Sequence, residues 1–152
     1  MLAIADNNGN IVAPIVVKPV NVHDSRLFHE SFSELLELAD LLNLDIHNSY
    51  FTLDSGFSNQ WTKSEILFRK MIPVIKPNLG RLRNQKKINE VLDEFEIVKN
   101  IYKERINIER CFAWEDTYRK LSVRYEKRQD TFMGFRYLGY SMINFRSVFG
   151  KK

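Results

Sequence analysis

The segment that most constrains how this chain folds runs from residue 102 to residue 121 and reads YKERINIERCFAWEDTYRKL. It contains no Gly and no Pro, and its apolar residues recur with helical spacing, so we predict one helix over residues 99–125. Steps of three and four residues place five side chains on one stripe of this helix: Tyr102, Arg105, Glu109, Phe112 and Asp116. Beside the stripe, Ile101, Ile108 and Cys111 form an apolar seam, which predicts that the helix packs on a core and presents Glu109 at its edge.

The composition is that of one globular domain with a mildly basic surface. A chain of 152 residues, of which 44% are hydrophobic and 28% charged, is long enough for one core. Its formal net charge of +4 suits a polyanionic partner, although many proteins without such a partner are equally basic. The single cysteine, Cys111, excludes an internal disulfide and a cysteine-based zinc cluster, and we expect a reducing compartment.

No segment predicts a secretory or membrane location. The first residues lack the basic start and apolar core of a signal peptide. The most hydrophobic late segment, from Phe132 to Phe149, is interrupted by Arg136 and Arg146, so we expect an amphipathic helix there. We therefore expect a cytoplasmic protein with no membrane partner.

Alternating strand and helix patterns predict an α/β fold. Two apolar runs flank the turn-forming residues 6–10, which predicts a β-hairpin over residues 1–18. The run from Tyr50 to Leu53 is rich in β-forming residues and is followed by Asp54, so we expect a strand over residues 50–54 with this carboxylate at its end. The other expected elements are helices over 25–42, 59–71, 88–98 and 131–149 and a strand over 73–77.

The expected last helix, over residues 131–149, carries a broad apolar stripe. Its members recur at steps of three and four residues: Phe132, Phe135, Leu138, Met142, Phe145 and Phe149. This pattern favours packing in the core or against a partner over a cofactor site.

Two clusters of cations are candidates for contact with a nucleic acid. The first lies in an expected loop over residues 78–87 and consists of Arg81, Arg83, Lys86 and Lys87; the second includes Arg119 and Lys120. Such side chains bind phosphate groups. A solvated loop without a ligand explains the first cluster equally well.

Several motifs together resemble the catalytic domain of bacterial insertion-sequence DDE transposases. The order Tyr102, two residues, Arg105, three residues, Glu109 is similar to the signature around the catalytic Glu of that family. Three more segments have counterparts in the family: residues 53–57 (LDSGF), 72–77 (IPVIKP) and 21–24 (NVHD). The resemblance covers nearly the whole chain and implies an RNase H-like fold, in which helices flank a mixed sheet.

The resemblance also implies a two-metal phosphoryl-transfer site. Asp54 and Glu109 would be catalytic carboxylates that bind Mg²⁺ or Mn²⁺. Arg105 would bind a phosphate of the DNA, or it would form a salt bridge to Glu109 one helical turn away. Tyr102 would stack on an unpaired base or pack inside the protein. Without the resemblance, Asp54 is explained more simply as a residue that caps its own turn.

The family has three catalytic acids, and residues 1–152 contain only two of them in matching sequence contexts. Asp6 lies in the expected hairpin turn, whereas the resemblance places the first catalytic Asp on a central strand that would precede Met1. We therefore expect residues 1–152 to form a partial catalytic domain that lacks its first, central strand. A second departure is Asp116, which stands where the family often carries a Lys.

The resemblance implies a transposase fragment that hydrolyses and joins DNA at insertion-sequence ends. Its expected partners are transposon-end and target DNA, a transposase polypeptide from an upstream reading frame, and a second copy of this chain. One alternative is a catalytically inactive remnant that only binds DNA or interferes with an intact transposase. Another is an RNase H-like nuclease unrelated to transposition.

Overall fold

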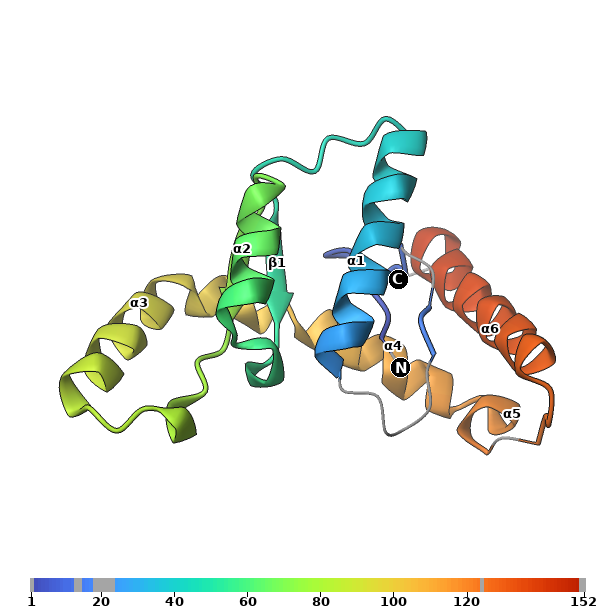
Figure 1. Ribbon diagram of the computed structural model, residues 1–152. Coiled ribbons are helices and arrows are strands. Elements are labelled where there is room, and N and C mark those ends of the chain that lie inside the picture. Colours follow the sequence, from blue (N-terminus) through green and yellow to red (C-terminus); the bar gives the residue numbers. More distant parts are fainter. Residues whose placement is uncertain (1, 13–14, 18–23, 124, 151–152) are drawn as a thin grey trace. The chain divides into compact units, whose positions relative to one another are not determined.

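The computed structural model describes residues 2–12, 15–17, 24–123 and 125–150 (Figure 1). The motif residues 21–23 lie outside this part of the chain, as do the side chains of residues 24–26, Arg81 and Lys120. Two compact units make up the structure. Unit 1 contains residues 1–2 and 16–105, and unit 2 contains residues 3–15 and 106–152. Each unit buries its own set of apolar side chains.

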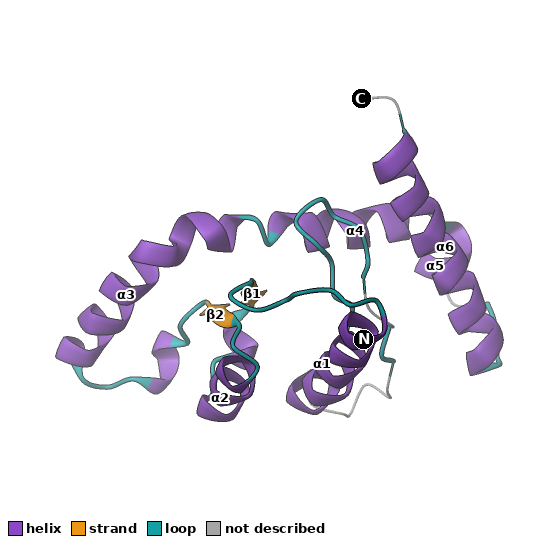
Figure 2. Cartoon of the chain, turned by 90° about the horizontal axis from the view of Figure 1, so that it is seen from above, coloured by secondary structure: helices purple, strands orange, loops and turns teal. Residues whose placement is uncertain are grey.

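Unit 1 is built around a strand, helix, strand sequence. β1 (Tyr50–Leu53) is followed by the short helix η1 (Ser55–Phe57), by α2 (Gln60–Phe68) and by β2 (Ile72–Ile75). The strands pair in parallel, with Tyr50 opposite Ile72 and Leu53 opposite Ile75 (Figure 2). A parallel pair needs a crossover connection, which α2 provides. Both strands therefore end at the same edge, where Asp54 follows β1.

An aromatic cluster fills the core of unit 1. Phe28 and Phe32 of α1 (Asp24–Leu41) are buried one helical turn apart, with their rings stacked at a centroid distance of 5.1 Å. The ring of Phe51 from β1 meets both of them edge-on. Aromatic pairs of this kind stabilise a core beyond the burial of their area. The cluster thus fixes β1, and with it Asp54, against α1.

Residues 78–87 do not form the single basic loop that was expected. Residues 79–81 form the short helix η2 (Leu79–Arg81), and α3 (Gln85–Lys103) begins earlier than the predicted bound of residue 88. The reason is the cap Asn84, whose side-chain oxygen accepts hydrogen bonds from the backbone N–H groups of Lys86 and Lys87. Lys86 and Lys87 therefore lie in the first turn of a helix.

The expected single helix over residues 99–125 is wrong. It is divided into the end of α3, α4 (Ile106–Asp116) and α5 (Arg119–Ser122). At the first break the N–H of Arg105 bonds to the carbonyl of Tyr102, three residues back instead of four. At the second, the hydroxyl of Thr117 donates to the carbonyl of Trp114 and competes with the helical bond there. Tyr102 and Glu109 therefore stand on different helices.

Unit 2 packs a turn of the chain against α4 and α6 (Gln129–Phe149). Antiparallel backbone bonding joins Ala5 to Ile11, but no regular strand is formed in the described part of the expected hairpin over residues 1–18. The Asn144 side chain of α6 donates to the carbonyl of Ile11 and accepts from its N–H, so it acts as a substitute strand partner. The Leu2 to Val16 pairing belongs to unit 1.

The α/β class is confirmed, with a parallel pair of strands in the described residues where a larger mixed sheet was expected. The RNase H-like arrangement and its missing central strand stay predictions. Among the described residues, every helix is too short or too polar to cross a bilayer.

Candidate catalytic site

Asp54 stands at the edge of the sheet directly after β1, and its carboxylate is held in a fixed orientation. Oδ1 accepts a hydrogen bond of 2.8 Å from the N–H of Gly56. A Cβ atom at residue 56 would lie 3.0 Å from the same oxygen, so glycine permits this close approach. The side chain remains 46% exposed. Asp54 therefore caps its own turn through Oδ1, as expected, and its Oδ2 atom is left for contacts outside the turn.

Arg105, the last residue of unit 1 in sequence, places a cation near Asp54. Its Nη2 lies 3.8 Å from Oδ2 of Asp54, a distance too long for a hydrogen bond but within the range of an ion pair. The guanidinium carries five N–H donors in a planar fork, a geometry that matches a phosphate group. The two residues come from elements 51 positions apart in sequence, and only the fold brings them together.

Tyr102 lies on the last turn of α3. Its ring meets that of Phe95 edge-on, with a centroid distance of 5.2 Å. The packing role expected as one alternative for Tyr102 is therefore supported, while stacking on a base stays a prediction.

Glu109 belongs to unit 2 and is exposed in the first turn of α4. Residues on both sides of it fix the helix to the turn at residues 6–10. The Asn107 side chain donates to the carbonyl of Asn7, and the buried thiol of Cys111 donates to the carbonyl of Gly9. Burial raises the pKa of this thiol, and the charge of Asp6 raises it further. Cys111 is therefore a neutral core residue, as its place on the apolar seam predicted.

A complete metal site is not formed in the part of the chain that the structure describes. Asp54 and Glu109 offer the oxygen donors that Mg²⁺ prefers, but no group of three or more His, Cys, Asp or Glu side chains gathers among these residues. Asp6 does not fill the gap, because Oδ1 accepts from the N–H groups of Asn8 and Asn10 and Oδ2 from the Asn10 amide. The donor chemistry of these two carboxylates fits a divalent cation, which proteins commonly bind through one or two carboxylates together with substrate phosphates.

A sequence model described as "Transposase DDE domain" matches residues 1–138. The chain belongs to this family. The matched range contains Asp54, Arg105 and Glu109, and it confirms the resemblance found in the motifs. Comparisons with curated proteins and with solved structures found no match.

The cations expected to contact DNA in this DDE domain are distributed over both units. Arg83, Lys86 and Lys87 are exposed in unit 1, where the two lysines lie at the amino end of α3. Arg119 is exposed at the start of α5 in unit 2. Arg81 and Lys120 stand beside these residues in sequence. A helix amino end attracts phosphate groups, which adds to the charge of Lys86 and Lys87.

A buried polar cluster between α4 and α6 was not predicted from the sequence. Glu115 of α4 is only 4% exposed; it accepts a hydrogen bond from the hydroxyl of Tyr140 and pairs with Arg136 at 2.9 Å. Burial and the bond to Glu115 raise the pKa of Tyr140. The sequence signal that could have predicted this cluster is Arg136, because a charged residue within an apolar stripe needs a partner when it is buried. The cluster fastens α4, which carries Glu109, to α6.

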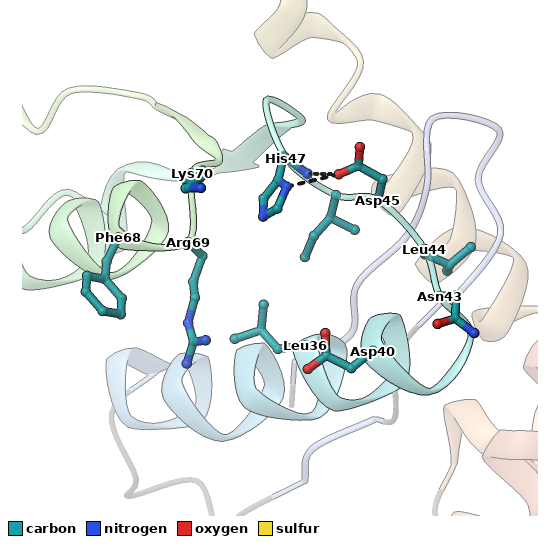
Figure 3. A pocket seen from close by; sticks show the side chains of 10 residues that line it. Leu36, Asp40, Asn43, Leu44, Asp45, His47, Phe68, Arg69 and Lys70 are labelled. Atoms are coloured by element: carbon teal, nitrogen blue, oxygen red, sulfur yellow. Dashed lines mark hydrogen bonds and ion pairs between the residues drawn. The ribbon is translucent and has the colours of Figure 1, made fainter.

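A pocket of about 500 Å³ opens elsewhere in unit 1, where the carboxyl ends of α1 and α2 meet (Figure 3). Acidic and basic side chains line it together, among them Asp40, Asp45, Arg69 and Lys70. His47 also lines the pocket, and its Nδ1 atom lies 3.2 Å from Oδ1 of Asp45. Asp54, Arg105 and the predicted DNA-binding residues do not line this pocket, so it is separate from the candidate catalytic site.

Proposed function

We propose that this DDE domain supplies Asp54 and Glu109 to a site for phosphodiester hydrolysis and strand transfer at insertion-sequence ends. The observation that carries the proposal is the position of Asp54. It stands at the carboxyl end of a parallel strand, the edge at which α/β proteins place ligands, with Arg105 at 3.8 Å. Membership of the transposase family supports the same assignment.

The roles of the residues follow from their contacts. The Gly56 N–H holds Oδ1 of Asp54, which keeps the carboxylate in one orientation. Arg105 binds a phosphate oxygen of the DNA through its guanidinium. A divalent cation held by Asp54 and Glu109 would supply charge stabilisation for the transferring phosphoryl group.

We further propose that a third carboxylate comes from another polypeptide segment, encoded by an upstream reading frame. The basis is the family's acidic triad of two Asp and one Glu, of which Asp54 and Glu109 are the members in matching sequence contexts. The proposal predicts that the purified chain does not cut DNA and that a joined product with the upstream segment does.

The test is a nicking assay with Mn²⁺ and a labelled duplex that carries the insertion-sequence end. We expect no nicking by the chain alone and nicking by the joined product. Asp54→Asn in the joined product should abolish the reaction, while Asp45→Asn, at an exposed aspartate outside the site, should leave it unchanged. Nicking that survives Asp54→Asn would refute the assignment of Asp54. Nicking by the chain alone that is lost in Asp54→Asn would refute only the third carboxylate in trans.

An inactive remnant that binds DNA is the second candidate; the exposed Lys86 and Lys87 at the amino end of α3 are the observation that favours DNA binding. It predicts salt-dependent binding to DNA without cleavage, for the chain and for the joined product alike.

A further inference from the structure

The pocket of unit 1 lies where the carboxyl ends of α1 and α2 meet, and both helices end in the same way (Figure 3). The second residue after each helix has a left-handed backbone conformation: Asn43 after α1, with φ of 52°, and Lys70 after α2, with φ of 57°. The N–H that follows each of them bonds to a helical carbonyl five residues back. The carbonyl of Lys70 also accepts from the N–H of Asn48 at 2.8 Å. These backbone bonds fix the walls of the pocket.

Lys70 is the unusual member of this pair. Asparagine adopts the left-handed conformation readily, but a lysine at this position is strained, and glycine is the residue that helices normally place there. Lys70 is exposed and lines the pocket. Strained residues that persist in a fold gather at ligand-binding and catalytic sites. The conformation of Lys70 therefore points to a function of its side chain in the pocket.

The end of α2 offers a phosphate-binding group and a stacking surface side by side. Arg69 lines the pocket next to Lys70, and Figure 3 shows its side chain extending from α2 toward α1. Its guanidinium lies 5.7 Å from the centroid of the Phe68 ring, and Phe68 is 78% exposed. Such cations bind phosphate groups, while an exposed ring beside an arginine is a platform on which a nucleic-acid base stacks.

The α1 side of the pocket carries hydrogen-bond acceptors. Asp40 and Asn43 line it there, and their side-chain oxygens can accept from the N–H groups of a base or from a sugar hydroxyl. Leu36 adds apolar surface. Asp45, the second carboxylate of the pocket, accepts a hydrogen bond of 3.0 Å from the N–H of His47 and pairs with its ring. The pocket thus has a cationic side and a side of acceptors.

A ligand that combines an anion, a flat ring and hydrogen-bond donors is a nucleotide. A pocket of about 500 Å³ is within the range of about 300–1,000 Å³ that small ligands occupy. We propose that the pocket binds one 5′-phosphorylated nucleotide, with its phosphate on Arg69 and Lys70 and its base on the Phe68 ring. The nucleotide is free or is the phosphorylated end of a DNA single strand. This binding is separate from the reaction proposed at Asp54, so either proposal can fail without the other.

The experiment is an NMR titration of the full ¹⁵N-labelled chain with three probes: dAMP, a short 5′-phosphorylated DNA single strand, and the same strand without the phosphate. We expect dAMP to cause saturable shifts of the backbone N–H signals of residues 43–47 and 68–70, and the strand without the phosphate to bind more weakly than the phosphorylated one. Tighter binding of the phosphorylated strand than of dAMP would identify a strand end as the ligand, and the reverse order would identify a free nucleotide.

Several results of this titration would overturn the proposal. One is the absence of saturable shifts with every probe, and another is shifts confined to the Asp54 turn or to α3. A third is equal affinity for dAMP and for a short glutamate peptide, because the pocket would then recognise negative charge alone.

Substitutions on α2 test the two contacts separately. Arg69→Gln and Phe68→Ala should each raise the Kd for dAMP about tenfold, since they remove a phosphate contact and the stacking surface. The matched controls are Arg128→Gln and Phe149→Ala, which remove an exposed arginine and an exposed ring from unit 2 and should leave the Kd unchanged. Equal losses in the variants and in the controls would contradict the site.

Lys70→Gly separates binding from stability. A cation near the carboxyl end of a helix also stabilises the helix dipole, so a purely structural role for Lys70 predicts a lower urea midpoint and an unchanged Kd. A binding role predicts the opposite, because glycine relieves the left-handed conformation and raises the midpoint, while loss of the ammonium group raises the Kd for dAMP several-fold. An unchanged Kd in both Lys70→Gly and Arg69→Gln would overturn the proposal.

Discussion

Glu115 is a buried acid whose pairing partners are critical for the stability of unit 2. Its carboxylate is removed from water but is paired with the Arg136 guanidinium and the Tyr140 hydroxyl. Such a cluster contributes little relative to an apolar core of the same shape, yet the loss of one partner leaves a buried charge without compensation. The energetic importance of Glu115 therefore becomes visible only when a partner is removed.

We predict that Arg136→Met lowers the free energy of unfolding by about 3–5 kcal/mol. The matched control is Arg128→Met, which removes an Arg that also pairs with a carboxylate, Asp130 at 2.6 Å, but on the surface. Exposed pairs contribute about 1 kcal/mol or less. Urea denaturation of both variants measures the difference. Equal losses in the two variants would show that the Glu115 cluster is not buried in solution.

Alkaline pH should destabilise the fold through two buried acids. Burial raises the pKa of Cys111 above its ordinary value near 9, and burial with the Glu115 bond raises that of Tyr140. The folded chain therefore keeps both protons at a pH where the unfolded chain loses them. The stabilisation is complete below the unfolded pKa values and declines as pH rises above about 9, by at most about 1.4 kcal/mol per pH unit and group.

Urea denaturation between pH 7 and pH 11 checks this expectation. The decline above about pH 10 should be shallower in Tyr140→Phe, because that variant has no phenol to ionise on unfolding. A slope that is identical in the two proteins would contradict the role of Tyr140.

At the scale of single elements, the sequence predicted those whose cause is local. Tyr50 to Leu53 form a strand and Asp54 ends it, because β-forming residues precede a turn that Ser55 and Gly56 make possible. The break at Arg105 has no Gly or Pro to announce it, and the Arg105 side chain there is directed to Asp54, a distant residue. Glu115 was missed for the same reason, since its partners Arg136 and Tyr140 are far away in sequence. Sequence patterns report local preference, whereas these features depend on tertiary contact.

Two glycines of α6 provide a test at this scale. Gly134 has open space around it, so Gly134→Ala should stabilise the helix by about 0.5–1 kcal/mol. Gly139→Ala would bring a methyl group to 2.8 Å from the buried Leu121 side chain, and overpacking of this kind costs about 1–3 kcal/mol, more than the gain in helix propensity. Urea denaturation should therefore give shifts of opposite sign. Stabilisation by both substitutions would mean that α6 does not pack closely on α5.

At the scale of the whole molecule, the positions of the basic residues determine where a nucleic acid would bind, more than the net charge does. The net charge of +4 is modest, but Lys86 and Lys87 stand together at the amino end of α3, where the helix dipole adds to their field. Lys99 and Lys103 lie near the other end of the same helix. They are engaged with Glu96 at 2.6 Å and with Asn100 at 3.0 Å. One helix thus offers two pairs of lysines that differ in their surroundings.

We predict that replacing Lys86 and Lys87 by Gln weakens binding to duplex DNA at low salt and reduces the slope of log K against log salt concentration. Each phosphate contact contributes about 0.9 to that slope through counterion release, so the loss should be about 1.8 if both lysines contact phosphates. The control replaces Lys99 and Lys103 by Gln, which removes the same charge from the same helix. A fluorescence anisotropy titration over a range of salt concentrations measures both. Equal effects of the two pairs would mean that DNA senses only net charge, and no effect of either would exclude α3 from the DNA-binding surface.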